Sequence, residues 1–316
     1  MTATGSQPHQ HRIAVIGAGS IGIGLAVVHA THRHAVTVFD PDAAQRDSAL
    51  PNIAAILDDL ASYGLLETEV KSALANVEIA STIGQAVANT CLVHECAPEN
   101  LTIKRQLTQE LDQAAPVNAV IASASSAIMA SEFADTLQGR RRCLIAHPGN
   151  PPFLIPVVEI VPAAFTAPEA VQKATSILTA AGMSPVHVRK ELRGFVFNRL
   201  QGALLREAYC LVRDDVAAVE DIDRIVRDGL GLRWSVIGPF ETVDLNTRGG
   251  IERHAELLGP AYAAMGAERG QHDPWTKDLV AKVTSERRAL LPADKRDARI
   301  RWRDRQLMRL LACRRA

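Results

Sequence analysis

The stretch Ile13-Ala-Val-Ile16-Gly17-Ala-Gly19-Ser20-Ile21-Gly22 decides the fold of this chain. Its apolar first half predicts a short buried strand, and the apolar segment Gly22–Ala30 predicts a helix directly after it. Between a strand and a helix, the G-x-G-x-x-G pattern is typical of a loop that binds a dinucleotide, although such glycines also form purely structural turns. In a binding loop the first glycine allows a tight turn, the second admits the pyrophosphate, and the third lets the helix pack closely. We therefore expect the following residues to hold a dinucleotide: Gly17, Gly19, Ser20, Ile21 and Gly22.

An acidic residue, Asp40, ends the next strand-like run, 23 residues after Gly17. A carboxylate at that place accepts hydrogen bonds from the adenosine ribose and repels a 2′-phosphate. Pro41 and Asp42 follow, with no arginine ready to receive such a phosphate. The sequence therefore favours NAD over NADP, and an aspartate that only caps the next turn is the alternative.

The chain alternates strand-like and helix-like segments as far as Leu192. Several of the strand-like runs are continuously apolar, as expected for a sheet that helices cover on both faces. The alternation predicts an α/β fold, with a Rossmann-type, doubly wound and mostly parallel sheet over residues 12–192. The expected strands are Arg12–Gly17, Ala35–Asp40, Val77–Ala80, Thr90–Glu95, Ala119–Ser123, Cys143–His147, Val157–Val161 and Pro185–Arg189.

Strand signals end after Leu192, and residues 193–316 predict a second, all-α domain. Asp273-Pro274 is typical of a helix start, because proline suits the first helical turn. We expect an irregular segment through Gly238-Pro239. The expected helices are Phe195–Val212, Asp221–Gly229, Gly250–Leu258, Trp275–Leu291 and Asp297–Cys313.

The composition argues against several classes of protein. Thirty-five basic residues balance thirty-five acidic ones, and no basic patch carries the interleaved aromatics that suit nucleic acid. The apolar runs are far shorter than the ~20 residues that span a bilayer. Five cysteines without a C-x-x-C pair argue against a disulfide framework or zinc site, and no histidine–carboxylate spacing suggests another metal. Residues 1–11 are polar, so we expect a disordered lead-in without a signal peptide, and a cytoplasmic protein.

A second stretch, Cys143–Glu159, carries the chemistry. It places His147 and Glu159 twelve residues apart, on two strand-like runs joined by a Pro/Gly-rich turn. If the runs pair, the carboxylate fixes the tautomer of the imidazole and stabilises its charged form, as a general base requires. For a lone histidine, burial against a carbonyl is the alternative, but the strand end and the neighbouring Asn150 favour the base. The histidines expected to be solvated are His29, His32 and His34.

Three further polar residues each have two interpretations. Ser126 follows the strand Ala119–Ser123 at the edge where such a sheet binds its ligand, so it can bond a substrate oxygen or cap the next helix. Asn198 opens the helical domain, where a lone asparagine is usually on the surface or bonds locally. Arg233 lies in a Gly-rich, Pro-punctuated stretch, where its guanidinium can anchor a substrate carboxylate or form a surface ion pair.

These motifs, in this order, resemble the 3-hydroxyacyl-CoA dehydrogenase superfamily from Ile13 to about Leu311. The resemblance implies a homodimer, because family members pair through the helical domain. It implies an active site in which Asn198 belongs to a Gly-Phe-x-x-Asn-Arg motif. The implied catalytic residues are Ser126, His147, Glu159 and Asn198.

The resemblance also implies cofactor contacts beyond the glycine-rich loop. The segment Glu95–Lys104 is similar to the family's strand-to-helix turn, whose second acid and lysine approach the nicotinamide half of NAD. These are Glu99 and Lys104 here. Asn150 matches a family asparagine that contacts the cofactor.

Within the superfamily the chain is most similar to the L-gulonate 3-dehydrogenase, or lambda-crystallin, subfamily. His147-Pro-Gly-Asn-Pro-Pro replaces the His-Phe-Phe-Asn-Pro of acyl-CoA enzymes, although Gly149 departs from the subfamily's valine. The subfamily implies NAD-dependent oxidation of the 3-hydroxyl of a small polar hydroxy acid, L-gulonate or a related sugar acid, to the 3-keto acid. The other similar strings are Gly229–Pro239, Phe240–Asn246 and Arg301–Leu310.

Other readings of this similarity stay open. L-carnitine is an alternative substrate, because its dehydrogenases share a similar Gly-Leu-Arg-Trp string. 3-Hydroxyacyl-CoA is another, but only Arg46 and Lys71 face seven acids between Pro41 and Ala80, a balance that repels a 3′-phospho-ADP group. A crystallin-like protein that binds NAD without turnover is disfavoured by the complete set of catalytic residues.

Overall fold

The computed structural model describes residues 11–235, 237–248, 250–269, 278, 289 and 292–315. Apart from His11 and two single positions, the expected lead-in and the expected helix Trp275–Leu291 lie outside the described residues. Contacts divide the chain into two units, Met1–Asn198 with Ile300–Ala316, and Arg199–Arg299. They thus group the end of the chain with the first unit, whereas the sequence suggested one continuous domain over residues 193–316.

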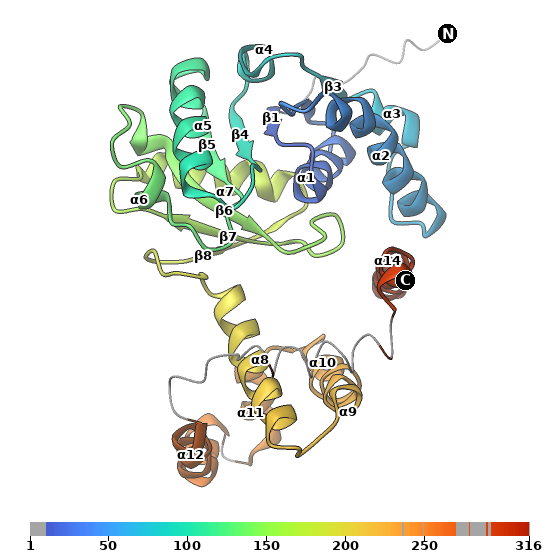
Figure 1. Cartoon of the computed structure of the whole chain (residues 1–316), viewed down its shortest axis with the longest axis vertical. Helices are drawn as coiled ribbons and strands as arrows, with labels where there is room; N and C mark the ends of the chain where they lie inside the picture. The colour runs from blue at the N-terminus through green and yellow to red at the C-terminus, as the bar shows by residue number, and fades with distance from the viewer. Residues whose placement is uncertain are drawn as a thin grey trace. The chain divides into compact units, whose positions relative to one another are not determined.

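The first unit is built on one eight-stranded sheet (Figure 1). Its strand order is β3-β2-β1-β4-β5-β6-β7-β8, and neighbours are parallel except β6 and β7. The expected doubly wound, mostly parallel fold is confirmed, and each expected strand forms at its place. The strands are β1 Arg12–Ile16, β2 Ala35–Phe39, β3 Val77–Ile79, β4 Leu92–Glu95, β5 Val120–Ser123, β6 Cys143–Pro148, β7 Val157–Pro162 and β8 Ser184–His187.

Helices cover both faces of this sheet (Figure 1). Alternate residues of β1 enter two separate cores: Ile13 and Val15 pack with α1, α2 and α7, whereas Ala14 and Ile16 pack with α4, α5 and α6. Burial on both faces explains why the strands are continuously apolar. The helices are α1 Ser20–Thr31, α2 Ala43–Ser62, α3 Val70–Leu74, α4 Ile83–Val87, α5 Leu101–Ala114, α6 Ala130–Phe133, the 3-10 turn Arg140–Arg142 and α7 Pro168–Ala180.

The later part of the chain is helical where it is described. The expected irregular segment is shorter than the sequence suggested, because a π-helical turn and α10 continue α9 as far as Trp234. The helical run is interrupted near Gly238. Pro239 then begins α11, at a first helical position that suits proline. The elements are α8 Phe197–Arg213, α9 Val219–Arg224, the π-helix Ile225–Leu230, α10 Gly231–Trp234, α11 Pro239–Asn246, α12 Gly250–Arg269, the 3-10 turn Ala293–Lys295 and α14 Arg296–Arg315. In these described segments no helix is long and apolar enough to cross a membrane.

His29 and His34 are fully buried, which corrects the expectation that they are solvated; His32 is exposed. Nδ1 of His29 lies 2.9 Å from Nδ1 of His34. Nε2 of His29 lies 2.9 Å from Nε2 of His94, a fully buried side chain of β4. The three imidazoles therefore serve one another as hydrogen-bond partners between α1 and β4. Nε2 of His34 and Nδ1 of His94 have no partner among the described residues.

Candidate active site

His147 and Glu159 lie directly opposite each other on the antiparallel strands β6 and β7. Nδ1 of His147 is 2.8 Å from Oε2 of Glu159, and both residues are buried. The turn between the strands brings them together, closed by a hydrogen bond from the Gly149 amide to the Val157 carbonyl. A side chain at Gly149 has no room, because its Cβ would lie 2.4 Å from Ile155 Cγ2. In this structure Ile155 therefore occupies the space that a side chain at position 149 would need.

The second oxygen of Glu159 fixes the pair to the backbone. Oε1 accepts hydrogen bonds from the amides of Val196 and Phe197, at 2.7 and 2.9 Å. Burial alone would raise the pKa of Glu159, but the hydrogen bonds from His147 and these amides hold it below the ordinary value. The carboxylate therefore stays ionised, keeps the proton of His147 on Nδ1, and leaves Nε2 as the basic atom.

Ser126 and Asn198 are also brought together. The side-chain amide of Asn198, in the first turn of α8, donates a 2.9 Å hydrogen bond to the Ser126 carbonyl. Ser126 follows β5, which neighbours β6, and its side chain is exposed. The parallel pairing of β5 with β6 ends at Ser123↔Ile145, and His147 lies two residues further along β6. The Ser126 loop and His147 therefore both lie at the carboxyl edge of the sheet.

Glu99 and Lys104 have different surroundings. Lys104 is fully buried, and its Nζ lies 3.0 and 3.1 Å from the two carboxylate oxygens of Glu95. Glu99 is partly exposed and binds the Ser126 loop through Ser125 and two amides. The sequence interpretation missed Glu95, which is buried and also accepts a hydrogen bond from Ser123. A charged residue at the end of an apolar strand is the signal that points to it.

The glycine-rich loop has the shape that a dinucleotide requires. Gly17 has a φ of +112°, and a Cβ there would lie 2.7 Å from the Cys96 carbonyl oxygen. A Cβ at Gly22 would lie 1.9 Å from the Gly17 carbonyl oxygen, whereas a Cβ at Gly19 meets nothing within 4 Å. The first and third glycines are thus needed for packing, and the second leaves open space in front of the amino end of α1. This arrangement fits a pyrophosphate.

Asp40 follows β2 beside this loop, and its Oδ2 accepts a 2.8 Å hydrogen bond from the Ala18 amide. Arg46 lies nearby, but its guanidinium is engaged with backbone carbonyl oxygens. Nη1 of Arg46 donates to the carbonyl oxygens of Asp40 and Pro41, at 2.7 and 3.1 Å. The carboxylate of Asp40 is therefore the group that opposes a 2′-phosphate here.

Asn150 and Arg233 make no hydrogen bond or ion pair with the other site residues among those that the structure describes. Asn150 is exposed in the turn between β6 and β7. Arg233 is exposed in α10, within the second unit, so it lies in a helical turn and not in the irregular segment that the sequence suggested. Among the residues that the structure describes, no cluster of histidine, cysteine and acidic side chains is placed to hold a metal ion.

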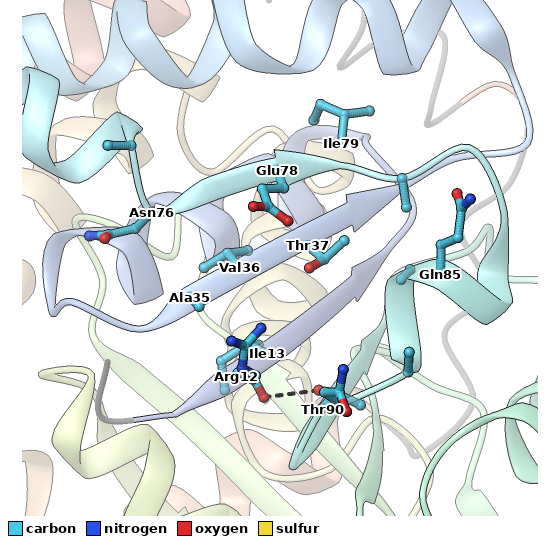
Figure 2. Close-up of a pocket in the computed structure, with 15 residues that line it drawn as sticks. Arg12, Ile13, Ala35, Val36, Thr37, Asn76, Glu78, Ile79, Gln85 and Thr90 are labelled. Atoms are coloured by element: carbon cyan, nitrogen blue, oxygen red, sulfur yellow. Dashed lines mark hydrogen bonds between the residues drawn. The ribbon is translucent and has the colours of Figure 1, made fainter. Parts of the chain in front are cut away.

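A polar hollow of about 390 Å³ lies elsewhere on the sheet (Figure 2). Figure 2 shows side chains of β1, β2 and β3 around it, including Arg12, Thr37 and Glu78, with Gln85 of α4. Its lining includes Arg12 and Ala35 at the amino ends of β1 and β2, and it contains neither the glycine-rich loop nor Asp40. Dinucleotides bind outside the carboxyl ends of such strands, so this hollow is not the cofactor site.

Known proteins resemble the chain over nearly its whole length. A bovine (Bos taurus) lambda-crystallin homolog is 35% identical over 310 residues, 94% of each chain. An L-carnitine dehydrogenase of Pseudomonas putida is 38% identical over 264 residues, 83% of this chain and 78% of the relative. Among solved structures, an NAD+-dependent dismutase, FHMPC 5-dehydrogenase, has a TM-score of 0.82 at 27% identity, covering 95% of this chain and 97% of that one.

Profiles of two protein domains match the two parts of the sequence. The NAD binding domain of 3-hydroxyacyl-CoA dehydrogenase matches residues 12–192, and the C-terminal domain of that enzyme matches residues 194–289. The glycine-rich loop and Asp40 suit the NAD that the first domain binds. The chain therefore belongs to the 3-hydroxyacyl-CoA dehydrogenase family of NAD-dependent dehydrogenases that act on CH–OH groups.

Proposed function

We propose that this enzyme oxidises the 3-hydroxyl of a small polar 3-hydroxy acid, L-gulonate or a similar sugar acid, to the 3-keto acid. The observation that carries the proposal is the buried His147–Glu159 pair, which leaves Nε2 of His147 without a hydrogen bond to any described residue. That atom is a base held ready for a substrate hydroxyl.

The residues of this chain have the following roles in the proposed reaction. Nε2 of His147 takes the hydroxyl proton, and Glu159 stabilises the imidazolium that forms. The hydroxyl of Ser126 and the side chain of Asn198 hold the reacting oxygen, so that its developing charge is stabilised where it arises. When bound, NAD would accept the hydride that leaves C3, and the residues that would hold it are the loop Gly17–Gly22, Asp40 and Asn150.

Charge supports a free acid over a CoA ester. The segment from Pro41 to Ala80 carries two basic residues and seven acidic ones, and it would repel the 3′-phospho-ADP group of CoA. The lambda-crystallin homologs, which match the chain nearly end to end, support the same choice. We include Arg233 as the anchor for the substrate carboxylate, because a guanidinium binds a carboxylate bidentately.

L-Carnitine is the second candidate substrate, favoured by the L-carnitine dehydrogenases at 37% and 38% identity. A quaternary ammonium needs aromatic faces. Trp234 is 40% exposed beside Arg233, although aromatics form only 4% of the chain. 3-Hydroxyacyl-CoA is a further alternative substrate, supported only by the match to the two domains of 3-hydroxyacyl-CoA dehydrogenase.

Absorbance of NADH across four substrates tests the proposal: L-gulonate, L-carnitine, L-3-hydroxybutyrate and 3-hydroxybutyryl-CoA, each with NAD+. We expect the highest kcat/KM with L-gulonate. If kcat/KM is higher with L-carnitine or with the CoA ester, that compound is the better substrate and the proposal of a sugar acid is wrong. Tight NADH binding without turnover of any of them would support the silent, crystallin-like alternative.

We also propose a cytoplasmic homodimer that forms through the helical domain. Large apolar side chains are exposed on the described helices of the second unit, where a single chain gains nothing from exposing them. Sedimentation at micromolar concentration tests this, and a stable monomer would contradict it. The exposed side chains include Leu200, Leu204, Leu205, Phe240, Leu245, Tyr262 and Met265.

A further inference from the structure

The loop that carries Ser126 is held by one carboxylate oxygen. Oε1 of Glu99 accepts hydrogen bonds from the Ser125 hydroxyl at 2.7 Å, the Ala127 amide at 2.8 Å and the Ile128 amide at 3.1 Å. The donors at 125 and 127 are the residues immediately before and after Ser126. Glu99 therefore fixes both sides of Ser126 without contacting its side chain.

The same loop is also held by Asn198, whose side-chain amide donates a hydrogen bond to the Ser126 carbonyl. These bonds hold the Ser126 carbonyl and both neighbouring residues, so they restrict the backbone of Ser126. The side chain of Ser126 can still rotate about χ1. Its hydroxyl makes no hydrogen bond within the described part of the chain, and so it is free for a ligand.

Glu99 is itself anchored by buried charge. Its Oε2 lies 3.9 Å from Nζ of Lys104, and Lys104 bonds both oxygens of Glu95 and the Ala97 carbonyl. Burial alone would raise the pKa of Glu99, but the three hydrogen bonds and the charge of Lys104 hold it below the ordinary value. An ionised acceptor makes stronger hydrogen bonds than a neutral one, so the ionised state is the one that holds the loop firmly.

We propose that Glu99 is a positioning residue that sets the place of the Ser126 hydroxyl, with Lys104 and Glu95 as its support. This inference rests on the proposed function in giving Ser126 a role at the reacting oxygen. It differs from the family-based expectation, in which Glu99 approaches the nicotinamide, because Oε1 is fully committed to the loop. It predicts that Glu99 affects the chemical step and leaves the affinity for NADH unchanged.

The test compares Glu99→Gln with Glu110→Gln, an exposed glutamate of α5 that loses the same charge. We expect Glu99→Gln to lower kcat by about 10- to 100-fold, the range for a small misplacement of a catalytic group. The Kd of NADH, followed by its fluorescence, should stay within about twofold. Glu110→Gln should change neither quantity. A rise in the NADH Kd of about tenfold with kcat unchanged would overturn the proposal.

A double-mutant cycle asks whether Glu99 acts through Ser126. If it does, Glu99→Gln should have less than about a threefold effect on kcat once Ser126 is alanine, because residues that act as a unit are not additive. A full, additive effect in the Ser126→Ala background would show that Glu99 acts elsewhere. A Glu99→Ala variant should repeat the result with a larger loss.

Hydrogen exchange separates this inference from the proposed function. Glu99→Gln should speed amide exchange in a peptide that covers residues 124–129, where the wild type and Glu110→Gln exchange slowly. Unchanged exchange at the Ala127 and Ile128 amides would overturn the positioning role. If the wild type oxidises none of the hydroxy acids, the proposed function fails, and the exchange measurement still decides what Glu99 holds.

Discussion

Nδ1 of His147 lies 2.8 Å from Oε2 of Glu159, across the antiparallel pairing of β6 and β7. The imidazole cannot turn without breaking this bond, and Glu159 cannot turn without releasing the amides of Val196 and Phe197. The rings of Phe195 and Phe197 lie beside the imidazole, with centroids 5.6 and 6.2 Å away. The basic nitrogen is therefore fixed in direction as well as in tautomer.

His147→Ala should lose ~2 to 4 orders of magnitude in kcat, the range for deletion of a general base. The affinity for NADH should be nearly intact, because the histidine is not part of the dinucleotide loop. His187→Ala, which removes an exposed histidine of β8, is the matched control and should keep wild-type turnover. Turnover of the His147→Ala enzyme within a few-fold of wild type would remove His147 from the mechanism.

The three buried histidines His29, His34 and His94 should make folding sensitive to acid. Burial lowers the pKa of His94 to about 4, and burial with the charges of His11 and His32 lowers the pKa of His34 to about 4. Burial and then the neighbouring imidazoles lower the pKa of His29 well below its ordinary value. Their contribution to stability is therefore complete above about pH 6.5 and is lost as the pH falls towards about 4.

Urea unfolding at a series of pH values between these limits measures the effect. Each histidine that stays neutral in the folded state adds up to ~1.4 kcal/mol per pH unit to the slope of the unfolding free energy. His94→Leu should reduce that slope by up to one such contribution, whereas His187→Leu, at an exposed site of β8, should leave it unchanged. Equal slopes in the wild type and His94→Leu would show that His94 is not held neutral by the fold.

Periodicity and apolar runs predicted the sheet well, because each strand of a doubly covered sheet must be apolar wherever it lies. The His147–Glu159 pairing could be anticipated because a short turn between two strand-like runs restricts their register. The histidine cluster could not be predicted from the sequence. His29 and His34 flank a turn, where histidines are usually exposed, and His94 lies some sixty residues further on. The three become partners only when α1 packs on β4. Glu95 was missed for the same reason: its partner Lys104 explains its burial, and a single sequence does not show that pair.

Arg233→Lys should raise the KM for a free hydroxy acid and change kcat less, because lysine keeps the charge and loses the bidentate fork. The guanidinium is exposed in α10 and has no ion pair with another described residue, so it is available for a ligand. Arg227→Lys, in the preceding π-helical turn and paired with Asp228, is the control. An Arg233→Lys enzyme with unchanged KM and kcat would place the carboxylate anchor elsewhere.

Asp40→Ala should weaken NAD binding and narrow the preference for NAD over NADP. The substitution removes the acceptor for the ribose hydroxyls and the charge that repels a 2′-phosphate. It leaves Arg46 in place, with its guanidinium bonded to the carbonyl oxygens of Asp40 and Pro41. We therefore expect Arg46 to supply the cation for NADP in the Asp40→Ala enzyme.

The combined variant Asp40→Ala/Arg46→Ala separates the two effects. If repulsion by Asp40 is the whole barrier, the double variant should bind NADP as well as Asp40→Ala does. If Arg46 pairs with the 2′-phosphate, the double variant should bind NADP more weakly by about tenfold, in the range of a charge-assisted hydrogen bond, with NAD binding little changed. Binding constants for both cofactors in the three enzymes check this. A ratio of the two constants that is the same in the wild type and Asp40→Ala would show that Asp40 is only a turn residue.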